Sequence, residues 1–314
     1  MFDKITLRAN LTADESEAMA RTHRLKMWVN ESGTAREYRS DSYANITGMT
    51  IRINSRGQMT MKASLHKYWN KRVDGRMRNH DDFTLDEAIL AFNMILAENN
   101  LEPNKTRITQ FEIGANLEVE YDPQEYIERC LYIWTPDKNM FVDANFRMNR
   151  QRTTMKHKDM RKYFKIYDKG FEMIDRRRVS RDNRMKILRI ETVHRRHSEK
   201  ISTFVTRENF KRLASRFKTD WSSLFFERKV VADKGTRKSE LDRAKEILNI
   251  GIEAYVAKMR QKYDDGRLTY KQFRTCRDFA RDFELHGHRF RSVISVYEAD
   301  YQLKLKEIML HDLA

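Results

Sequence analysis

The sequence predicts an α+β fold, with a mixed or antiparallel sheet in residues 1–205 and an all-helical domain in residues 206–314. The first part contains short alternating segments, rich in β-branched residues and separated by turn residues, which is typical of strands. The last part contains long segments with helical periodicity and no proline. A chain of 314 residues, 40% of them hydrophobic, is large enough to bury a sizeable core.

The signals of the first part follow one another along the chain. Residues 46–54 and 58–64 alternate on either side of Ser55-Arg56-Gly57, which predicts a hairpin. Thr84 and Glu87 have the spacing of a capping box, so we expect a helix to about residue 98. We also expect a strand at 107–120, where Gly114 is a candidate for a bulge. A helix is predicted from Asp122-Pro123, followed by strands at 163–169 and 186–193.

The last third is expected to be helical throughout. The helical segments are predicted at 207–217, 221–231, 236–263, 269–286 and 290–310. No apolar run is long enough to span a membrane, and the N-terminus lacks the apolar core of a signal peptide. The two cysteines, Cys130 and Cys276, are far apart, which favours a reducing cytoplasm and no disulfide framework.

Positive charge is concentrated in one part of the chain. The chain has a net charge of +16, and residues 145–200 contain 19 Lys and Arg against seven Asp and Glu. Such a segment either lies in solvent or binds phosphates, and interleaved aromatic residues can stack on unpaired bases. A polyanion is therefore the expected partner. The predicted DNA contacts are Arg161, Lys162, Lys165, Arg176, Arg177 and Arg178.

One tyrosine in this basic segment has charged neighbours on both sides. Tyr167 is followed by Asp168 and Lys169, and Glu172 comes shortly after. A nearby cation can help a tyrosine hydroxyl to ionise, and the resulting phenolate can attack a phosphate. The alternative is a strand tyrosine packed on the core, with Asp and Lys in solvent. These residues alone favour that alternative.

Two further carboxylates lie inside predicted strands. Glu112 is flanked by Phe111 and Ile113, and Glu191 follows Leu188-Arg189-Ile190. Carboxylates on adjacent strands are suitable ligands for Mg²⁺ or Mn²⁺. The alternative is a salt bridge to Arg107 or Arg189.

The ordered set of these segments resembles the rolling-circle replication initiators of bacterial plasmids and filamentous phages. This is the phage/plasmid replication protein group, with its staphylococcal-plasmid and gene II types. The matching segments are Ser64-Leu65-His66-Lys67-Tyr68, Phe111-Glu112-Ile113-Gly114-Ala115-Asn116-Leu117, Ile166-Tyr167-Asp168-Lys169 with Glu172, and Leu188-Arg189-Ile190-Glu191. They span about residues 46–195 and leave the helical third uncovered.

The resemblance implies an endonuclease that cuts one DNA strand at an origin and rejoins it. Tyr167 matches the attacking tyrosine, with Tyr163 as a fallback, and Lys169 matches the basic residue beside it. Glu112, Glu191, Asp168 and Glu172 become candidate ligands for Mg²⁺ or Mn²⁺, although many relatives have aspartate where this chain has Glu112. The implied partners are origin DNA, a host helicase and polymerase in a bacterial cytoplasm, and a homodimer is compatible with the group. A non-catalytic origin- or operator-binding protein would explain the charge equally well.

Overall fold

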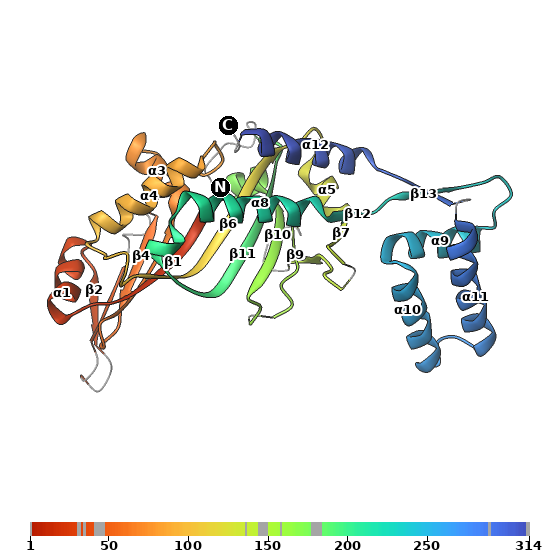
Figure 1. Cartoon of the computed structure of the whole chain (residues 1–314), viewed down its shortest axis with the longest axis horizontal. Helices are drawn as coiled ribbons and strands as arrows, with labels where there is room; N and C mark the ends of the chain where they lie inside the picture. The colour runs from red at the N-terminus through yellow and green to blue at the C-terminus, as the bar shows by residue number, and fades with distance from the viewer. Residues whose placement is uncertain are drawn as a thin grey trace.

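The computed structural model describes residues 2–29, 33, 36–40, 48–135, 137–143, 150–157, 159–176, 184–287 and 290–311. Its centre is a ten-stranded sheet in the order β2-β3-β4-β5-β1-β6-β11-β10-β9-β8 (Figure 1). All neighbouring strands in it are antiparallel. The strands are β1 (Phe2–Asn10), β2 (Lys26–Val29), β3 (Arg36–Arg39), β4 (Met49–Ile53), β5 (Gln58–Ser64), β6 (Arg107–Glu118), β8 (Phe141–Val142), β9 (Gln151–Thr153), β10 (Lys162–Asp168) and β11 (Ile187–Lys200).

Helices and two short ribbons complete the fold, which confirms the predicted α+β class. The ribbons pair β7 (Cys130–Ile133) with β12 (Leu224–Phe226), and β13 (Lys229–Ala232) with β14 (Phe290–Val293). The helices are α1 (Ala13–Thr22), α3 (Leu65–Val73), α4 (Leu85–Glu98), α5 (Pro123–Arg129), α6 (Lys169–Asp175), α7 (Ile201–Phe204), α8 (Arg207–Ser222), α9 (Lys238–Ile250), α10 (Ile252–Asp264), α11 (Tyr270–His286) and α12 (Val296–His311).

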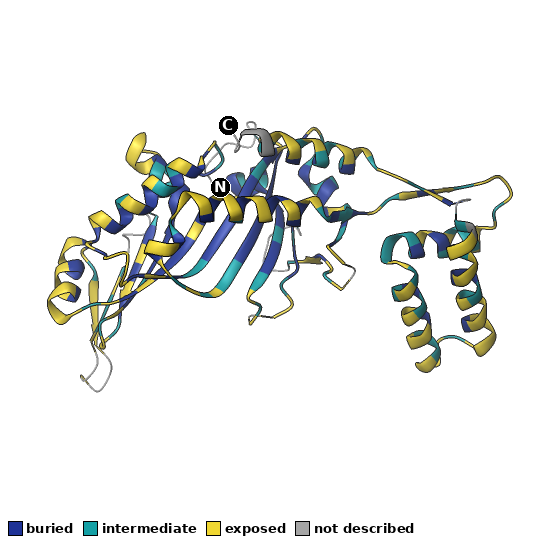
Figure 2. Ribbon diagram, in the orientation of Figure 1, coloured by how far each residue is buried: buried dark blue, intermediate teal, exposed yellow. Residues whose placement is uncertain are grey.

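One face of the sheet carries the main hydrophobic core. Helix α8 lies across this face in the foreground of Figure 1, and its buried side faces the strands in Figure 2. The rings of Phe2 on β1 and Phe210 on α8 stack with their centroids 4.1 Å apart. Trp221 is fully buried, and its indole Nε1 donates to Thr192 Oγ1 on β11 at 3.1 Å. These contacts fix α8 on the sheet and leave the opposite face for polar side chains.

Most elements of the first part form as the sequence predicts. The hairpin β4–β5 turns at Gly57, which has a φ of +72° and lies too close to Leu11 O for any larger residue. Helix α4 begins at the predicted capping box of Thr84 and Glu87. Strand β6 and helix α5 also form, and Asp122 caps α5 through the backbone N–H of Gln124.

The last third differs from an all-helical prediction in three places. Residues 221–231 end α8 and then form strands β12 and β13, and residues 290–293 form β14 before α12 begins. The predicted helix 236–263 is interrupted at Gly251, whose φ of +85° separates α9 from α10. The strands form because they pair with partners distant in the sequence, which helical periodicity cannot reveal. No helix among the described residues is long and apolar enough to cross a bilayer.

The apolar contacts divide the chain into two cores. The main core includes Phe210 and Trp221 of α8 and Tyr301 of α12, so both helices belong with the sheet. A second core contains Ala244, Tyr255, Phe273 and Phe290 and holds α9, α10 and α11 together at the end of the β13–β14 ribbon (Figure 1). The apolar contacts therefore do not separate at the predicted boundary between residues 205 and 206.

We predict that residues 230–292 can be replaced by a short Gly-Ser linker while the rest of the protein stays folded. Lys229 and Val293 are paired across the ribbon, so the linker spans only a few ångströms. None of the excised residues belongs to the main core. Circular dichroism should give a melting temperature for the excised variant within a few degrees of the transition that the main core shows in the full-length protein.

Deletion of residues 206–314 is the matched comparison. It removes Trp221 and Tyr301 from the main core, and loss of one buried Trp alone costs about 3–5 kcal/mol. This variant should show no cooperative thermal transition. A folded 1–205 fragment together with an unfolded excision variant would contradict this division of the chain.

Candidate active site on the polar face of the sheet

The strand register places the predicted tyrosine and both strand glutamates on one face of the sheet. Lys165 on β10 lies opposite Glu191 on β11, and Val193 lies opposite Glu112 on β6. Opposed residues in an antiparallel pair share a face, and alternate residues along a strand share it too. Tyr167, Lys165, Glu191 and Glu112 therefore all lie on the face away from α8.

The side chains of these residues are in direct contact. The hydroxyl of Tyr167 donates to Glu191 Oε1 at 2.9 Å. The ammonium group of Lys165 pairs with Glu191 Oε2 and lies 3.6 Å from Glu112 Oε2, so it connects the two carboxylates. Lys4 Nζ, which is half-exposed on β1, also donates to Glu112 Oε2 at 3.1 Å. The structure thus brings together residues from four adjacent strands.

Arg189 connects the members of this network and is itself fully buried. Its Nε donates to Glu191 Oε1 at 2.7 Å, and its Nη2 donates to Asp3 Oδ2 at 2.5 Å. Its Nη1 donates to Asn116 Oδ1 at 2.9 Å and to the carbonyl of Asn79 at 3.2 Å. The predicted alternative of a salt bridge between Arg189 and Glu191 is therefore present, and it forms part of a larger buried network.

Asp3 and Lys4 are the charged members of this network that the sequence analysis missed. A bulge in β1 sets the three-residue step from Phe2 to Ile5 against the two-residue step from Ile113 to Phe111 on β6. The bulge lets the neighbouring Asp3 and Lys4 both reach the polar face. The alternation of charged and apolar residues at the N-terminus was the available signal, but it did not identify Arg189 as the partner.

Gly114 makes room for the network. A Cβ atom at this position would lie 3.0 Å from Glu191 Cγ and 3.3 Å from Arg189 Nη2. Strands β6 and β11 pair through Gly114 without a register shift, so the bulge expected there is absent and lies in β1 instead. The glycine is explained by the close approach of two charged side chains rather than by a backbone irregularity.

Burial and charge set the protonation states of this cluster. Burial raises the pKa of Tyr167 well above its usual value, and the negative charge of Glu191 raises it further. Burial alone would raise the pKa of Glu191, but Lys165 and Arg189 outweigh it and hold this pKa well below its usual range. A neutral tyrosine hydroxyl thus donates to an ionised carboxylate. The cluster as a whole balances three carboxylates (Asp3, Glu112, Glu191) with three cations (Lys4, Lys165, Arg189).

Lys169 and Glu172 form the next layer of the network. Lys169 Nζ donates to Glu172 Oε2 at 2.5 Å and to Asn79 Oδ1 at 3.0 Å, and Asn79 also binds Arg189. Burial lowers the pKa of Lys169, and the charge of Arg189 lowers it further. Glu172 in addition pairs with exposed Arg176 at 3.0 Å. Lys169 is therefore connected to Tyr167 through intermediate side chains, at the first residue of α6.

The structure does not bring Asp168 into this cluster. Asp168 lies opposite Leu188 on the apolar face, because consecutive residues of a strand point to opposite sides. Its carboxylate caps α6 through the N–H of Phe171 at 2.8 Å and pairs with Arg150 and Arg184 at 2.6 and 2.7 Å. Asp168 thus positions the turn that follows Tyr167 and does not face the tyrosine hydroxyl.

These positions do not fit a metal ion held by all four predicted carboxylates. Glu112 and Glu191 share the ammonium group of Lys165, Glu172 is paired with Lys169, and Asp168 points to the other face. Within the described part of the chain, no three His, Cys, Asp or Glu side chains are grouped as a metal site would require. Of the four predicted carboxylates, Glu112 and Glu191 are the two that contact a common group, the ammonium of Lys165.

The predicted DNA contacts lie in different surroundings. Arg161 and Arg176 are exposed, whereas Lys165 belongs to the network. Lys162 is on the apolar face, where it pairs with Asp220 at 2.6 Å and lies 4.6 Å from the ring of Trp134. Arg177 and Arg178 lie outside the described residues.

Tyr163 shares the polar face with Tyr167. The two residues are four positions apart on β10, so a strand also puts them on one side, about 13 Å apart. The Tyr163 hydroxyl accepts from Arg195 Nη2 at 3.0 Å, and burial raises its pKa. Tyr163 therefore takes no part in the hydrogen bond between Tyr167 and Glu191 and has a different partner, Arg195.

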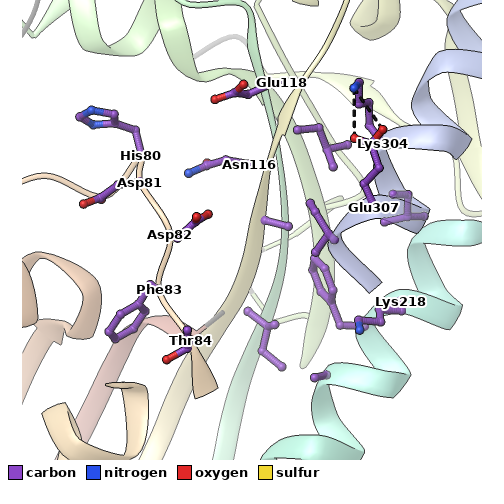
Figure 3. A pocket seen from close by; sticks show the side chains of 17 residues that line it. His80, Asp81, Asp82, Phe83, Thr84, Asn116, Glu118, Lys218, Lys304 and Glu307 are labelled. Atoms are coloured by element: carbon purple, nitrogen blue, oxygen red, sulfur yellow. Dashed lines mark hydrogen bonds and ion pairs between the residues drawn. The ribbon is translucent and has the colours of Figure 1, made fainter. Parts of the chain in front are cut away.

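A cavity of about 450 Å³ lies between β6, α8 and α12 (Figure 3). Asn116 and Glu118 line it from β6, Asp82 from the loop before α4, and Lys304 and Glu307 from α12. Tyr167 does not line it, so this cavity is not the site of the tyrosine. Asn116 connects the cavity to the network around Tyr167, because it lines the cavity and accepts a hydrogen bond from Arg189.

The sequence matches no family model and none of the curated proteins with which it was compared.

We predict that Arg189→Met lowers the free energy of unfolding by about 3–5 kcal/mol. The substitution leaves Asp3 and Glu191 buried without their shared cation, and breaking a buried pair on one side has a cost of this size. Urea unfolding at pH 7 measures it. Arg39→Met is the control, because Arg39 forms an exposed pair with Glu37 that should contribute at most about 1 kcal/mol. Equal losses in the two variants would contradict the role of Arg189.

We also predict that the protein loses stability as the pH falls below about 4.5. The pKa values of Asp3 and Glu191 are lower in the folded protein than in the unfolded chain, since Arg189 and a Lys outweigh the effect of burial on each. The unfolded chain therefore binds more protons, and their contribution is present above about pH 4.5 and lost below it. Urea unfolding between pH 3 and 7 should show this slope. Arg189→Met should flatten it, and an unchanged slope would exclude the network as its origin.

Proposed function

We propose that the protein nicks and rejoins one strand of DNA and thereby initiates rolling-circle replication at a plasmid or phage origin. The main support for this proposal is the hydrogen bond between Tyr167 and Glu191 on the polar face of the sheet. Glu112 lies on the same face, on the strand next to that of Glu191. Three residues chosen from separate sequence segments converge there with two cations, Lys165 and Arg189. The resemblance to replication initiators supplies the reaction class, and the charge of +16 supports a DNA substrate.

In the proposed reaction, the Tyr167 oxygen attacks the scissile phosphorus. A new bond forms between the tyrosine oxygen and phosphorus, and the bond from phosphorus to the 3′ oxygen breaks. The tyrosine proton passes to Glu191, the acceptor of its hydrogen bond, which becomes a stronger base when Lys165 leaves it to pair with the phosphate. The 3′ oxygen leaves as a hydroxyl after taking up a proton from solvent water, because Lys169 is buried and paired with Glu172 away from the tyrosine oxygen. The products are a 5′-phosphotyrosyl link and a free 3′-OH, and reversal of the same steps rejoins a strand.

The charges around Tyr167 have a defined part in this scheme. Lys165 and Arg189 would stabilise the negative charge that develops on the attacked phosphate. Tyr167 is only 7% exposed, so the phosphate reaches its oxygen only if neighbouring side chains move. Lys165 is the side chain best placed to do so, because it can exchange its pairing with Glu112 and Glu191 for a pairing with the phosphate.

The remaining components of the proposal come from the resemblance. They are Mg²⁺ or Mn²⁺, a host helicase and polymerase, and action in a bacterial cytoplasm. No step above is assigned to the metal ion. Its requirement is measured by repeating the assay below with EDTA.

We expect Tyr167→Phe to reduce nicking by at least about a thousandfold, because it removes the attacking oxygen and keeps the ring. The assay combines the protein, Mg²⁺ or Mn²⁺ and supercoiled DNA that carries the gene with its flanking sequence. Wild-type protein should give open circles with protein attached covalently to the 5′ end. Tyr163→Phe is the matched control and should retain nicking, since Tyr163 contacts Arg195 instead.

The outcomes separate the two function classes. Undiminished nicking by Tyr167→Phe would remove Tyr167 from the role of nucleophile. Tight DNA binding without any covalent product, for wild type as for Tyr167→Phe, would identify a non-catalytic origin- or operator-binding protein instead.

A further inference from the structure

The polar face that holds the candidate active site continues across the other half of the sheet. From β1 the register pairs Thr6 with Lys62 and Arg8 with Thr60 on β5. Thr60 lies opposite Arg52 on β4, Arg52 opposite Arg39 on β3, and Arg39 opposite Lys26 on β2. Because opposed residues share a face, these cations all lie on the side of Lys4 and Glu112. We call this surface the basic sheet face, and its cations are Lys4, Arg8, Lys26, Arg39, Arg52 and Lys62.

These cations are exposed, and on β1, β4 and β5 the residues that alternate with them are buried. Strand β4 alternates strictly, with Met49, Ile51 and Ile53 in the core and Arg52 in solvent. On β1 and β5, Arg8 and Lys62 are exposed while their neighbours Leu7 and Met61 are buried. Within the described part of the chain, Arg8 and Lys62 take part in no ion pair. The face is therefore a solvated, positively charged surface on a rigid sheet.

One carboxylate lies among the six cations. Glu37 on β3 pairs with Arg39 and, at 2.8 Å, with Arg52. Lys4 is already balanced by Glu112, so the other five cations and Glu37 leave the basic sheet face with four positive charges. Arg107 extends it on the β6 side, because it lies opposite Arg8 and is exposed.

An exposed aromatic ring stands at the far edge of the same face. Trp28 on β2 lies opposite Glu37 and is 53% exposed, and the guanidinium of Arg39 lies 5.6 Å from its ring. Trp28 therefore contributes little to the core, as do its exposed neighbours Met27 and Val29 on β2. A ring with a free face beside a cation is the arrangement on which unpaired bases stack.

We propose that the basic sheet face binds an extended single strand of DNA, which runs from Trp28 toward Tyr167. From β2 to β1 the face is four strand spacings wide, or about 19 Å, which accommodates several nucleotides. The cations contact phosphates, and Trp28 stacks on a base, which a duplex would keep paired and inaccessible. The inference rests on the proposed function in one respect: the bound strand is the strand that Tyr167 attacks.

The test measures binding of a fluorescent oligothymidylate of about 15 nucleotides by anisotropy, with metal-free Tyr167→Phe protein as the background. Three exposed cations are removed together in the variant Arg8→Gln, Arg52→Gln, Lys62→Gln. We expect its affinity at low salt to fall at least tenfold. The slope of log K against log salt should decrease by about 2, as expected when three phosphate contacts are lost. Trp28→Ala should weaken binding at least about fivefold, and Trp28→Phe should retain most of it.

The matched control removes three exposed cations from α8 and α12, the helices that cover the opposite face: Lys211→Gln, Arg216→Gln, Lys306→Gln. This control should bind the oligonucleotide like the background protein. Thermal melting checks that each variant is folded, and all the substituted side chains are exposed.

Two results would overturn the proposal. The first is equal affinity and equal salt dependence in the sheet-face variant and the control variant. The second is a preference for duplex over single-stranded DNA that disappears in the sheet-face variant, which would identify a duplex-binding surface. Because the background protein lacks the Tyr167 hydroxyl, loss of binding here is independent of whether wild-type protein nicks DNA. Intact binding with no nicking would leave this inference standing and remove the proposed function.

Discussion

The guanidinium of Arg189 is the group on which the polar side of the structure depends. A fully buried cation is costly unless it is paired and hydrogen-bonded, and Arg189 meets this requirement with Asp3, Glu191 and Asn116. These partners come from three strands, β1, β11 and β6. The bulge in β1 and the missing side chain at Gly114 are both explained by the space and reach that this arrangement needs.

The same sheet has two chemically different sides, and neighbouring residues have different tasks as a result. Glu191 and Tyr167 belong to the charged network, whereas Thr192 bonds to Trp221 and Asp168 caps α6 on the other side. The apolar side fixes α8 and α12 and gives the sheet its rigidity. A network of paired charges on a rigid sheet is pre-organised, which suits both a phosphate-transfer site and a surface that holds a DNA strand.

Sequence reasoning predicted part of this site for a sound reason. Tyr167, Glu112 and Glu191 lie in alternating segments, so their strands followed from periodicity, while the resemblance to replication initiators grouped the three residues in one site. Asp168 was grouped with them because it is adjacent in sequence, and strand alternation places it on the other side. Asp3 was not recognised, because its partner Arg189 is 186 residues away and only the order of the strands brings them together.

Charge counting had a similar limit. The first 64 residues contain ten Lys and Arg against seven Asp and Glu, which is almost balanced and gave no signal. The strand register separates these charges, since three of the carboxylates lie on α1 while six cations share one sheet face. By itself, the sequence determined the α+β class, the main strands, the capped helices and the segments that carry the tyrosine and glutamates, because these depend on local periodicity and local hydrogen bonds. Only the tertiary structure decided which charges meet, which side chains share a face, and that α8 and α12 belong to the sheet, because these depend on pairing between residues distant in the chain.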